Sequence, residues 1–170
     1  MPLNLLKKYN ALLDLSGLNE AQRSASLKRI FDRDITNNIR FLFRGKPIYP
    51  TPKENGEIAM ANLFNHLTRK MENQENRHRE YDPKRSERLH WIKFHVDEEK
   101  SDDMYYFSVN EPNGIRTYIY DDTEKYVIVL EPLRNQTAYY LLTAYPLTGK
   151  DSKRDKIKQK YNRRRLPNLL

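Results

Sequence analysis

The chain lacks cysteine altogether and has only five glycines in 170 residues. The missing cysteine excludes disulfides, thiolate catalysis and cysteine-based zinc or iron–sulfur sites. Neither GxGxxG nor GxxxxGK(S/T) occurs, so dinucleotide or ATP binding through those glycine-rich loops has no support.

Long apolar runs and metal-binding motifs are absent as well. No stretch approaches the roughly 18 apolar residues that a membrane-spanning helix needs, and the first residues do not read as a signal peptide. HExxH does not occur, and the acidic stretch 97–103 lacks the glycine and the spacing of an EF-hand loop. We therefore expect a cytoplasmic protein with no membrane partner, no metal and no cofactor.

Charged and aromatic residues make up much of what is present. The hydrophobic fraction is 38% and the charged fraction is 32%, respectively below and above the values of a typical globular domain. The 12 tyrosines and 6 phenylalanines still provide a large area for burial. The length suits one domain with a small helical addition.

Positive charge is concentrated toward the C-terminus. Residues 150–165 contain nine Lys or Arg and two Asp, which account for +7 of the formal net charge of +8. Such a patch raises the local concentration of a polyanion, and nucleic acid is the first candidate partner. The pattern leaves open whether this arm is a basic helix without a clear apolar face or is disordered.

Helical patterns come first along the chain and strand patterns come last. Apolar spacing predicts two helices within residues 1–38 and a third near 55–71, followed by a charged connector. Asp82-Pro83 is a specific start signal for a fourth helix. Alternating segments within 104–145 predict a four-stranded antiparallel meander. This order predicts an α+β fold, with helices on one face of a curved sheet. Its parts are an N-terminal helical segment (1–38), an α+β domain (39–150) and a basic C-terminal arm (151–170).

The predicted fourth helix combines histidine with cations. Its candidate catalytic residues are Arg85, Arg88, His90 and Lys93. With the apolar residues facing inward, His90 and Lys93 are i, i+3 neighbours on an adjacent flank. A histidine close to cations has a lowered proton affinity and can act as a general base near neutral pH. The alternative is that His90 is a partly buried helix residue and that the cations face solvent.

Thr143 lies in an apolar, tyrosine-rich segment directly before the basic arm. Threonine is common in strands for its β-propensity alone. Alternation along a strand would place Tyr139, Thr143 and Tyr145 on one face. Hydroxyls and rings beside cations can bind phosphate and stack on unpaired bases. The predicted RNA-binding residues are Tyr139, Lys150, Lys153, Arg154 and Lys156.

Three short segments together resemble a known family. They are Arg85-Ser86-Glu87-Arg88-Leu89-His90-Trp91-Ile92-Lys93, then Tyr126–Leu130 after the first strands of the meander, then Leu141–Tyr145. In this order they are similar to the phage-associated barnase–EndoU–colicin–RelE-like nucleases, which have the BECR fold. The resemblance covers about residues 40–160. It implies a small helix-plus-antiparallel-sheet fold, metal-independent RNA cleavage and toxin-like or phage-linked use. It also implies that the Arg/His motif and Thr143 are active-site positions.

The chemistry that the resemblance implies gives each candidate a role. The 2′-hydroxyl of RNA attacks the adjacent phosphate, while the enzyme moves protons and stabilises the phosphorane. His90 would be the base, and the three cations of the helix would stabilise charge. Thr143 would bind a phosphate oxygen and Tyr145 would help to position the chain, whereas no general acid is identified. The central prediction is that His90, Lys93 and Thr143 converge in one open cleft.

Two further functions fit the same features. One is a non-catalytic RNA- or DNA-binding protein, and the other is a structural or interaction protein of a phage. Only an endoribonuclease predicts RNA products. If the protein is a toxin, we expect a small acidic antitoxin or immunity protein as its partner, because complementary charge readily covers a cationic surface. The sequence predicts no particular oligomeric state.

Overall fold

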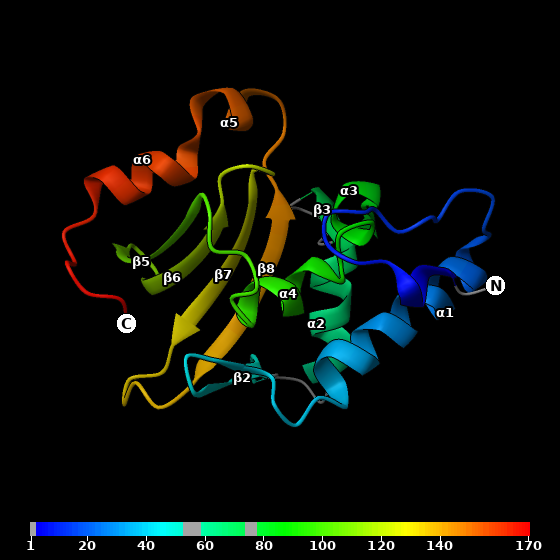
Figure 1. Cartoon of the computed structure of the whole chain (residues 1–170), viewed down its shortest axis with the longest axis horizontal. Helices are drawn as coiled ribbons and strands as arrows, with labels where there is room; N and C mark the ends of the chain where they lie inside the picture. The colour runs from blue at the N-terminus through cyan, green and yellow to red at the C-terminus, as the bar shows by residue number, and fades with distance from the viewer. Residues whose placement is uncertain (1–2, 53–58, 74–77) are drawn as a thin grey trace.

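The computed structural model describes residues 3–52, 59–73 and 78–170 and has an α+β fold (Figure 1). Its helices are η1 (Leu3–Leu6), α1 (Glu20–Phe31), η2 (Asp32–Thr36), α2 (Ala59–Thr68), α3 (Pro83–Ser86), α4 (Trp91–Val96), α5 (Gly149–Arg154) and α6 (Lys156–Arg163). Its strands are β1 (Leu42–Phe43), β2 (Lys46–Pro50), β3 (Arg69–Asn73), β4 (His78–Tyr81), β5 (Met104–Glu111), β6 (Gly114–Asp121), β7 (Tyr126–Pro132) and β8 (Tyr139–Pro146).

The main sheet is mixed and has six strands in the order β1-β2-β8-β7-β6-β5. β5 to β8 follow one another in antiparallel pairs. β2 lies parallel to β8, and β1 lies antiparallel to β2. The predicted four-stranded antiparallel sheet is therefore corrected. The sequence hides β2 because Pro47 and Pro50 are residues that normally mark turns or sheet edges.

Helices cover both faces of the curled sheet, not one face as predicted (Figure 1). The larger hydrophobic cluster joins α1, α2 and α4 to one face, and its fully buried members include Ile30, Phe31, Leu67, Trp91 and Ile128. The smaller cluster lies between the other face and α6, and it includes Phe107, Tyr120, Val127 and Ile157. The core therefore has two halves separated by the sheet.

The first predicted helix does not form beyond the short η1. The segment that follows η1 is mostly irregular up to α1, and the N–H of Leu13 donates to the carbonyl of Glu87 at 2.9 Å. Leu13 is buried, whereas Leu6 and Leu12 are 73% and 41% exposed. Only some of the regularly spaced apolar residues in this segment therefore serve the core, and contacts to the α3–α4 region replace helical hydrogen bonds.

The predicted fourth helix is divided into α3 and α4. Asp82 is the N-cap and Pro83 the first helical residue, as predicted, but α3 ends at Ser86 and α4 begins at Trp91. The side chains of Leu89 and Trp91 are each 1% exposed. A single straight helix would place Leu89 and Trp91 on nearly opposite sides, because they are two positions apart. The turn between α3 and α4 allows both side chains to enter the core.

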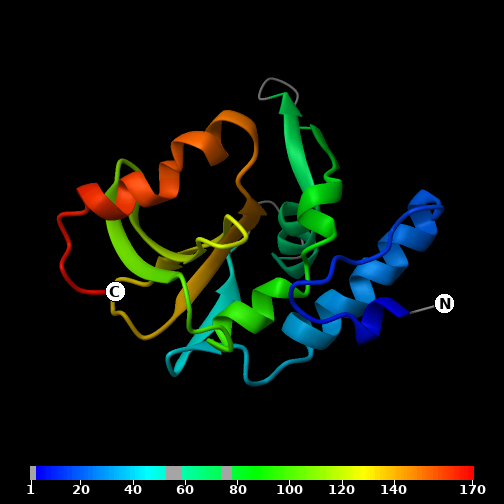
Figure 2. The same cartoon turned by 45° about the horizontal axis from the view of Figure 1, so that its top comes forward.

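The predicted charged connector begins and ends in a β-ribbon, and its residues 74–77 lie outside the described part of the chain. β3 and β4 pair antiparallel, with Arg69 opposite Tyr81 and Lys70 opposite Glu80. Figure 2 shows this ribbon extending away from the helices beside α3. Helix α2 therefore ends at Thr68, and Met71, which was predicted to be helical, belongs to β3.

The basic C-terminal arm is folded onto the sheet. Its helix α6 has an apolar face that sequence inspection missed: Ile157 is 2% exposed, and the ring of Tyr161 packs edge-on against Tyr105 with 4.9 Å between centroids. Ile157 and Tyr161 are four positions apart and therefore share one side of the helix. The arm is neither disordered nor without an apolar face.

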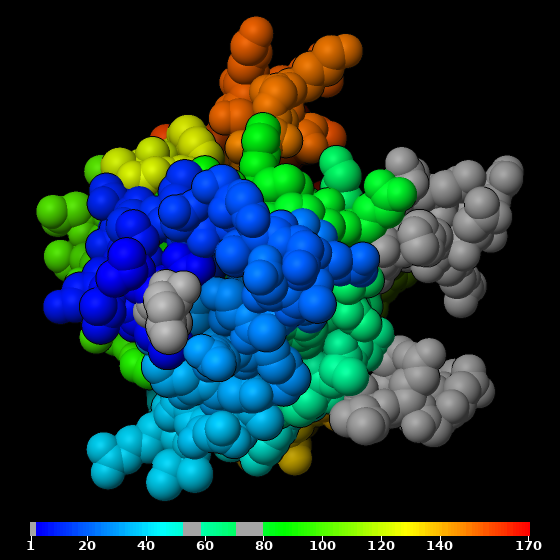
Figure 3. All heavy atoms as spheres, turned by 90° about the vertical axis from the view of Figure 1, so that its right-hand side faces the viewer, coloured from blue at the N-terminus to red at the C-terminus, as the bar shows by residue number. Residues whose placement is uncertain are grey.

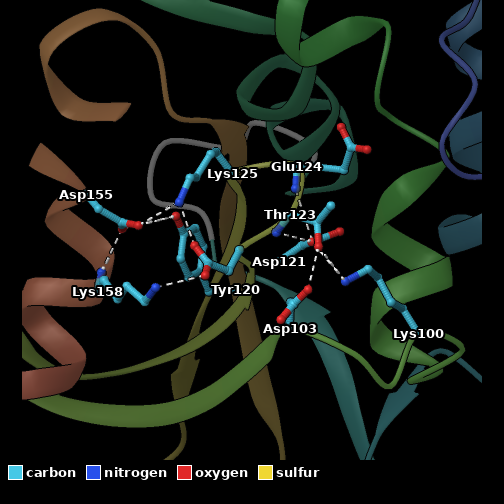
Figure 4. A network of polar contacts seen from close by, with 10 residues as sticks. Lys100, Asp103, Tyr120, Asp121, Thr123, Glu124, Lys125, Asp155 and Lys158 are labelled. Carbon is cyan, nitrogen blue, oxygen red and sulfur yellow. Dashed lines mark hydrogen bonds and ion pairs between the residues drawn. The ribbon is translucent and has the colours of Figure 1, made fainter. Parts of the chain in front are cut away.

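Polar contacts also hold α6 in place (Figure 4). Asp155, at the start of α6, accepts hydrogen bonds from the Tyr120 hydroxyl and from Lys125 Nζ, both at 3.0 Å. Lys158 Nζ lies 2.9 Å from Asp122 Oδ2. Lys158 and Lys160 of α6 therefore pair with carboxylates of the sheet and its turns. Among the helices of the described residues, none has both the length and the apolar character to cross a bilayer.

Candidate functional site

Two neighbouring cavities lie where α2, α3, β3 and β8 meet. The first has a volume of about 590 Å³ and is lined by Thr51, Asn62, Leu63, His66, Leu141, Leu142 and Thr143. The second has a volume of about 430 Å³, and its lining includes Asp82, Lys84, Tyr145, Thr148 and Asp151. Lys70 and Arg85 line both cavities. We name the two cavities together the Arg85 cleft.

The start of α3 is attached to the end of α2. The last carbonyl groups of a helix have no partner within the helix. Here the carbonyl of Thr68 accepts from the N–H of Asp82 and from the hydroxyl of Ser86, both at 2.9 Å. The carbonyl of His66 accepts from Arg85 Nη1 at 3.0 Å. These contacts fix the Arg85 side chain between the two helices.

The Arg85 guanidinium joins this helix junction to the sheet. Its Nε lies 3.3 Å from Asp82 Oδ2, and its Nη1 also donates to Thr143 Oγ1 at 3.2 Å. The Arg85 side chain is 19% exposed. Within the described part of the chain, Nη2 donates no hydrogen bond. Nε and Nη1 of the guanidinium are therefore held by protein groups, while Arg85 still lines both cavities.

Thr143 reaches this position because β8 contains a bulge. Leu141 is opposite Leu130, whereas Thr143 is opposite the preceding residue of β7, Val129, so Leu142 is an extra residue. A β-bulge of this kind breaks the alternation of side chains and redirects them locally. Leu141 belongs to the larger hydrophobic cluster, while the partner of Thr143, Val129, belongs to the smaller one.

The bulge divides β8 between the two faces of the sheet. Tyr139 belongs to the larger cluster, whereas Tyr145 packs against the smaller one. The prediction that Tyr139, Thr143 and Tyr145 share a face is therefore wrong. The pairing of β2 with β8 also ends with Pro50 opposite Leu141. Beyond that pair, Leu142 and Thr143 are not paired with β2, and they line the first cavity.

The ring of Tyr145 also lies beside Arg85. The guanidinium carbon of Arg85 is 5.3 Å from the centroid of the Tyr145 ring, within the range of a cation–π contact. Burial raises the pKa of the Tyr145 hydroxyl. Tyr145 thus borders the second cavity as a neutral ring beside a cation. Three of the predicted catalytic residues, Arg85, Thr143 and Tyr145, therefore lie close together.

His66 and Lys70 are cleft residues that sequence inspection missed. His66 is half-buried in α2 and lines the first cavity. Asn62 and His66 are four positions apart in α2 and lie beside the buried stripe of Leu63 and Leu67. That spacing is the signal that would have predicted a polar flank along the cavity.

The charge that lines the cleft is mainly positive. Its cations are Lys70, Lys84 and Arg85, and its carboxylates are Asp82 and Asp151. Asp82 is paired with Arg85, and Asp151 with Lys156 at 2.9 Å. Lys70 and Lys84 have no ion pair with any described residue. The cleft therefore presents a positive potential, which favours an anionic ligand.

His90 does not lie in this cleft. It is 5% exposed, and its Nε2 is 2.9 Å from the carbonyl oxygen of Ala11, which also accepts from Trp91 Nε1 at 3.1 Å. Burial lowers the pKa of His90. The predicted convergence of His90, Lys93 and Thr143 is therefore corrected, because the turn between α3 and α4 directs His90 toward the N-terminal segment.

Lys93 and Arg88 also point elsewhere. Lys93 lines a cavity of about 600 Å³ with His90, and its Nζ lies 2.5 Å from Asp97 Oδ2. The hydrogen bond to Asp97 raises the pKa of Lys93. Arg88 donates to the carbonyl of Lys84 at 2.8 Å and lies over the ring of Trp91. Of the helix candidates, Arg85 is the one that meets Thr143.

The predicted RNA-binding residues divide into buried and exposed groups. Tyr139 is 2% exposed, and its hydroxyl donates to the carbonyl of Leu170 at 2.8 Å, so its ring is closed to a base. Lys150, Lys153 and Arg154 are exposed on α5, which projects from the molecule (Figure 3). Lys156 is paired with Asp151. Since Thr148 and Asp151 line the second cavity, α5 begins at the edge of the cleft.

Within the described residues, no group of three or more His, Asp or Glu side chains is arranged to hold a metal ion. Comparison with protein-family models, curated proteins and solved structures finds no match to the chain.

Proposed function

We propose that the chain is an endoribonuclease that cleaves RNA by attack of the 2′-hydroxyl on the adjacent phosphate, with the Arg85 cleft as its active site. One observation carries the proposal: Arg85, fixed by Asp82 and by the end of α2, donates to Thr143 at a cavity that His66 also lines. A proton-transfer group, a fixed cation and a hydroxyl are thereby brought together.

Arg85 and Lys70 are suited to the charge that develops on the phosphorane. Both line the two cavities, so a phosphate placed between the cavities lies within reach of both cations. Donors that are already oriented stabilise a transition state without reorganising during the reaction. Thr143 is neutral and can donate its hydroxyl proton to a phosphate oxygen while it accepts from Arg85.

His66 replaces His90 as the proposed general base. Its side chain borders the cavity that contains Arg85 and Thr143, whereas His90 is enclosed by the N-terminal segment. A histidine titrates near neutral pH, and a positioned general base contributes a rate factor of about 10²–10⁴. The proposal assigns no second proton donor.

The decisive experiment incubates the purified full chain with single-stranded RNA in EDTA. We expect fragments that end in a 2′,3′-cyclic phosphate, because the 2′-oxygen is the nucleophile. Arg85→Ala and His66→Ala should each lower the cleavage rate at least about 100-fold. Arg40→Ala is the matched control, since Arg40 is exposed and has no side-chain partner among the described residues. Absence of products from several RNAs would refute the proposal.

A non-catalytic nucleic-acid-binding protein is the second candidate. The exposed cations of α5 at the edge of the cleft favour it, because phosphate contacts supply most of the affinity in sequence-independent binding. It predicts binding without products. Under either function, an acidic antitoxin or immunity protein would cover this same positive surface.

A further inference from the structure

The first cavity of the Arg85 cleft has two kinds of lining. Leu63, Leu141 and Leu142 supply apolar surface, whereas Asn62 and Thr51 supply polar groups. Neither Asn62 nor Thr51 makes a side-chain hydrogen bond to any described residue. A pocket that combines apolar surface with a few polar groups free to bind is typical of a small-molecule site.

We propose that this cavity binds one unpaired adenine next to the phosphate held by Arg85, and that Asn62 selects this base. The inference rests on the proposed function and names its substrate as single-stranded RNA with adenine beside the cleaved bond. The carboxamide of asparagine presents one donor and one acceptor in a plane, and it pairs with N6 and N7 of adenine through two hydrogen bonds.

The positions of the lining residues agree with this assignment. Leu142 is partly exposed and provides apolar surface for one face of the base, whereas Leu63 and Leu141 are 4% and 1% exposed and belong to the core behind it. The cavity of about 590 Å³ lies in the range of about 300–1,000 Å³ found for ligand sites. Asn62 lies one helical turn before His66 in α2. Base selection and proton transfer would thus come from the same flank of one helix.

The assignment requires that the base be unpaired. A base within a duplex has its Watson–Crick edge occupied and is stacked between neighbours, so it cannot enter a cavity between a helix and a strand. Proteins that read RNA sequence bind mostly to single-stranded segments for this reason. The second cavity, with the Tyr145 ring and Lys84, remains for the nucleotide on the other side of the phosphate.

The test measures binding separately from cleavage. The probes are short uridine oligonucleotides of 2′-fluoro RNA, which have no 2′-hydroxyl for attack and which carry A, C, G or U at one central position. With the full wild-type chain, we expect the adenine probe to bind about tenfold more tightly than the other three. Annealing to a complementary strand should remove the dependence on the central base.

Asn62→Ala should reduce the adenine preference to about twofold or less. The replacement favours the helix, since alanine has the higher helix propensity. Asn62→Asp is a second variant, which keeps the shape and replaces the amide donor with an acceptor, and it should lose the preference as well. Asn113→Ala is the matched control, because Asn113 is exposed in the turn between β5 and β6.

The outcomes separate this inference from the proposed function. Equal binding of all four probes by the wild type, or an unchanged preference in both Asn62 variants, would overturn the base assignment even if natural RNA is cleaved. An adenine preference that depends on Asn62 would support the assignment even if no RNA is cleaved, in which case only the nuclease proposal fails.

Discussion

Arg85 has a structural role as well as a proposed catalytic one, and Thr143 allows the two to be separated. The guanidinium contacts the carbonyl groups of His66 and Arg69 and the carboxylate of Asp82. Replacement of Arg85 therefore weakens the junction between α2 and α3 along with the cleft. Thr143 contributes one hydroxyl to Arg85 from the opposite wall, so its removal leaves the junction contacts in place.

Thr143→Val should lower the cleavage rate about ten- to 100-fold and leave the melting temperature nearly unchanged. A hydrogen bond to a charged group contributes about 1.5–3 kcal/mol, and each 1.4 kcal/mol corresponds to about tenfold in rate. The measurement is the single-turnover cleavage of RNA. Thr36→Val serves as the control, because Thr36 is exposed at the end of η2. Wild-type rates for Thr143→Val would remove this hydroxyl from the mechanism.

His90 should affect stability in a pH-dependent way and should not affect chemistry. Burial lowers its pKa below the ordinary value of 6.5, so the unfolded state binds a proton more readily than the folded state. The unfolding free energy is therefore expected to fall as the pH decreases below about 6.5. In His90→Gln this loss should be smaller, as measured by urea unfolding between pH 7 and pH 5.

The same variant tests the choice of His66 as the general base. His90→Gln should retain cleavage at pH 7 wherever it remains folded, because the buried imidazole of His90 lies outside the Arg85 cleft. If a folded His90→Gln protein were inactive, the role of general base would belong to His90 and not to His66.

At the scale of elements, some predictions could be made from sequence and others could not. The start of α3 was predicted because Asp82 and Pro83 act locally, through a cap and a fixed backbone angle. The end of α3 was not predicted, since the turn before Trp91 depends on the burial of residues against distant strands. The place of His66 in the cleft likewise depends on where α2 packs against β8.

The pairing of Arg85 with Thr143 was only partly predictable. The resemblance placed both residues at an active site, and the structure brings them to 3.2 Å. The choice between Arg85, Arg88, His90 and Lys93 could not be made, because a continuous helix was expected and its division changes the direction of the later residues. The bulge at Leu142 was also missed, since its cause lies in the pairing with β7.

Helix α6 should contribute strongly to stability through Ile157. Ile157→Ala should lower the unfolding free energy by about 2–4 kcal/mol, because it leaves a cavity between α6 and the sheet. The matched control is Ile39→Ala, since Ile39 is 95% exposed and its loss should change the value by less than about 0.5 kcal/mol. Equal effects of the two variants would show that α6 does not pack as described.

At the scale of the whole molecule, Asp121 connects segments that are far apart in sequence. Its carboxylate is fully buried, lies 3.1 Å from His95 Nε2 and 3.2 Å from Lys100 Nζ, and accepts from the Tyr9 hydroxyl. The N–H of Thr123 donates to the same carboxylate at 3.0 Å, and Figure 4 shows this turn beside Lys100. The Asp121 carboxylate of β6 thus contacts both the N-terminal segment and α4.

Acid unfolding should report on Asp121. Burial opposes ionisation, but hydrogen bonds from His95, Tyr9 and the backbone outweigh it and lower the pKa of Asp121 to about 2. The stability that the carboxylate contributes is present above the ordinary pKa of 3.8 and is lost as the pH falls toward about 2. Asp121→Asn should lower the melting temperature at pH 7 and flatten its decrease between pH 4 and pH 2. A parallel decrease in both proteins would contradict the assignment.

The folded arm changes how its charge must be tested. Deletion of residues 151–170 would remove Ile157 and Tyr161 from the core, so it would measure folding as well as binding. Replacement of Lys150, Lys153 and Arg154 by Gln removes only exposed cations. The slope of log K against log salt for single-stranded RNA should become shallower by up to about 2. The control replaces three exposed cations outside the Arg85 cleft, Lys8, Arg29 and Arg40, and should leave the slope unchanged.

The extra residue in β8 makes the site dependent on strand register as well as on residue type. β8 uses three consecutive residues, from Leu141 to Thr143, where β7 uses two. If these residues paired with β7 in regular register, Leu142 would lie opposite Val129, and the alternation of the strand would turn Thr143 to the other side of the sheet. Arg85 and Thr143 would then keep their identities and lose their contact. Deletion of Leu142, in contrast, would leave Thr143 opposite Val129, on the side where it already lies.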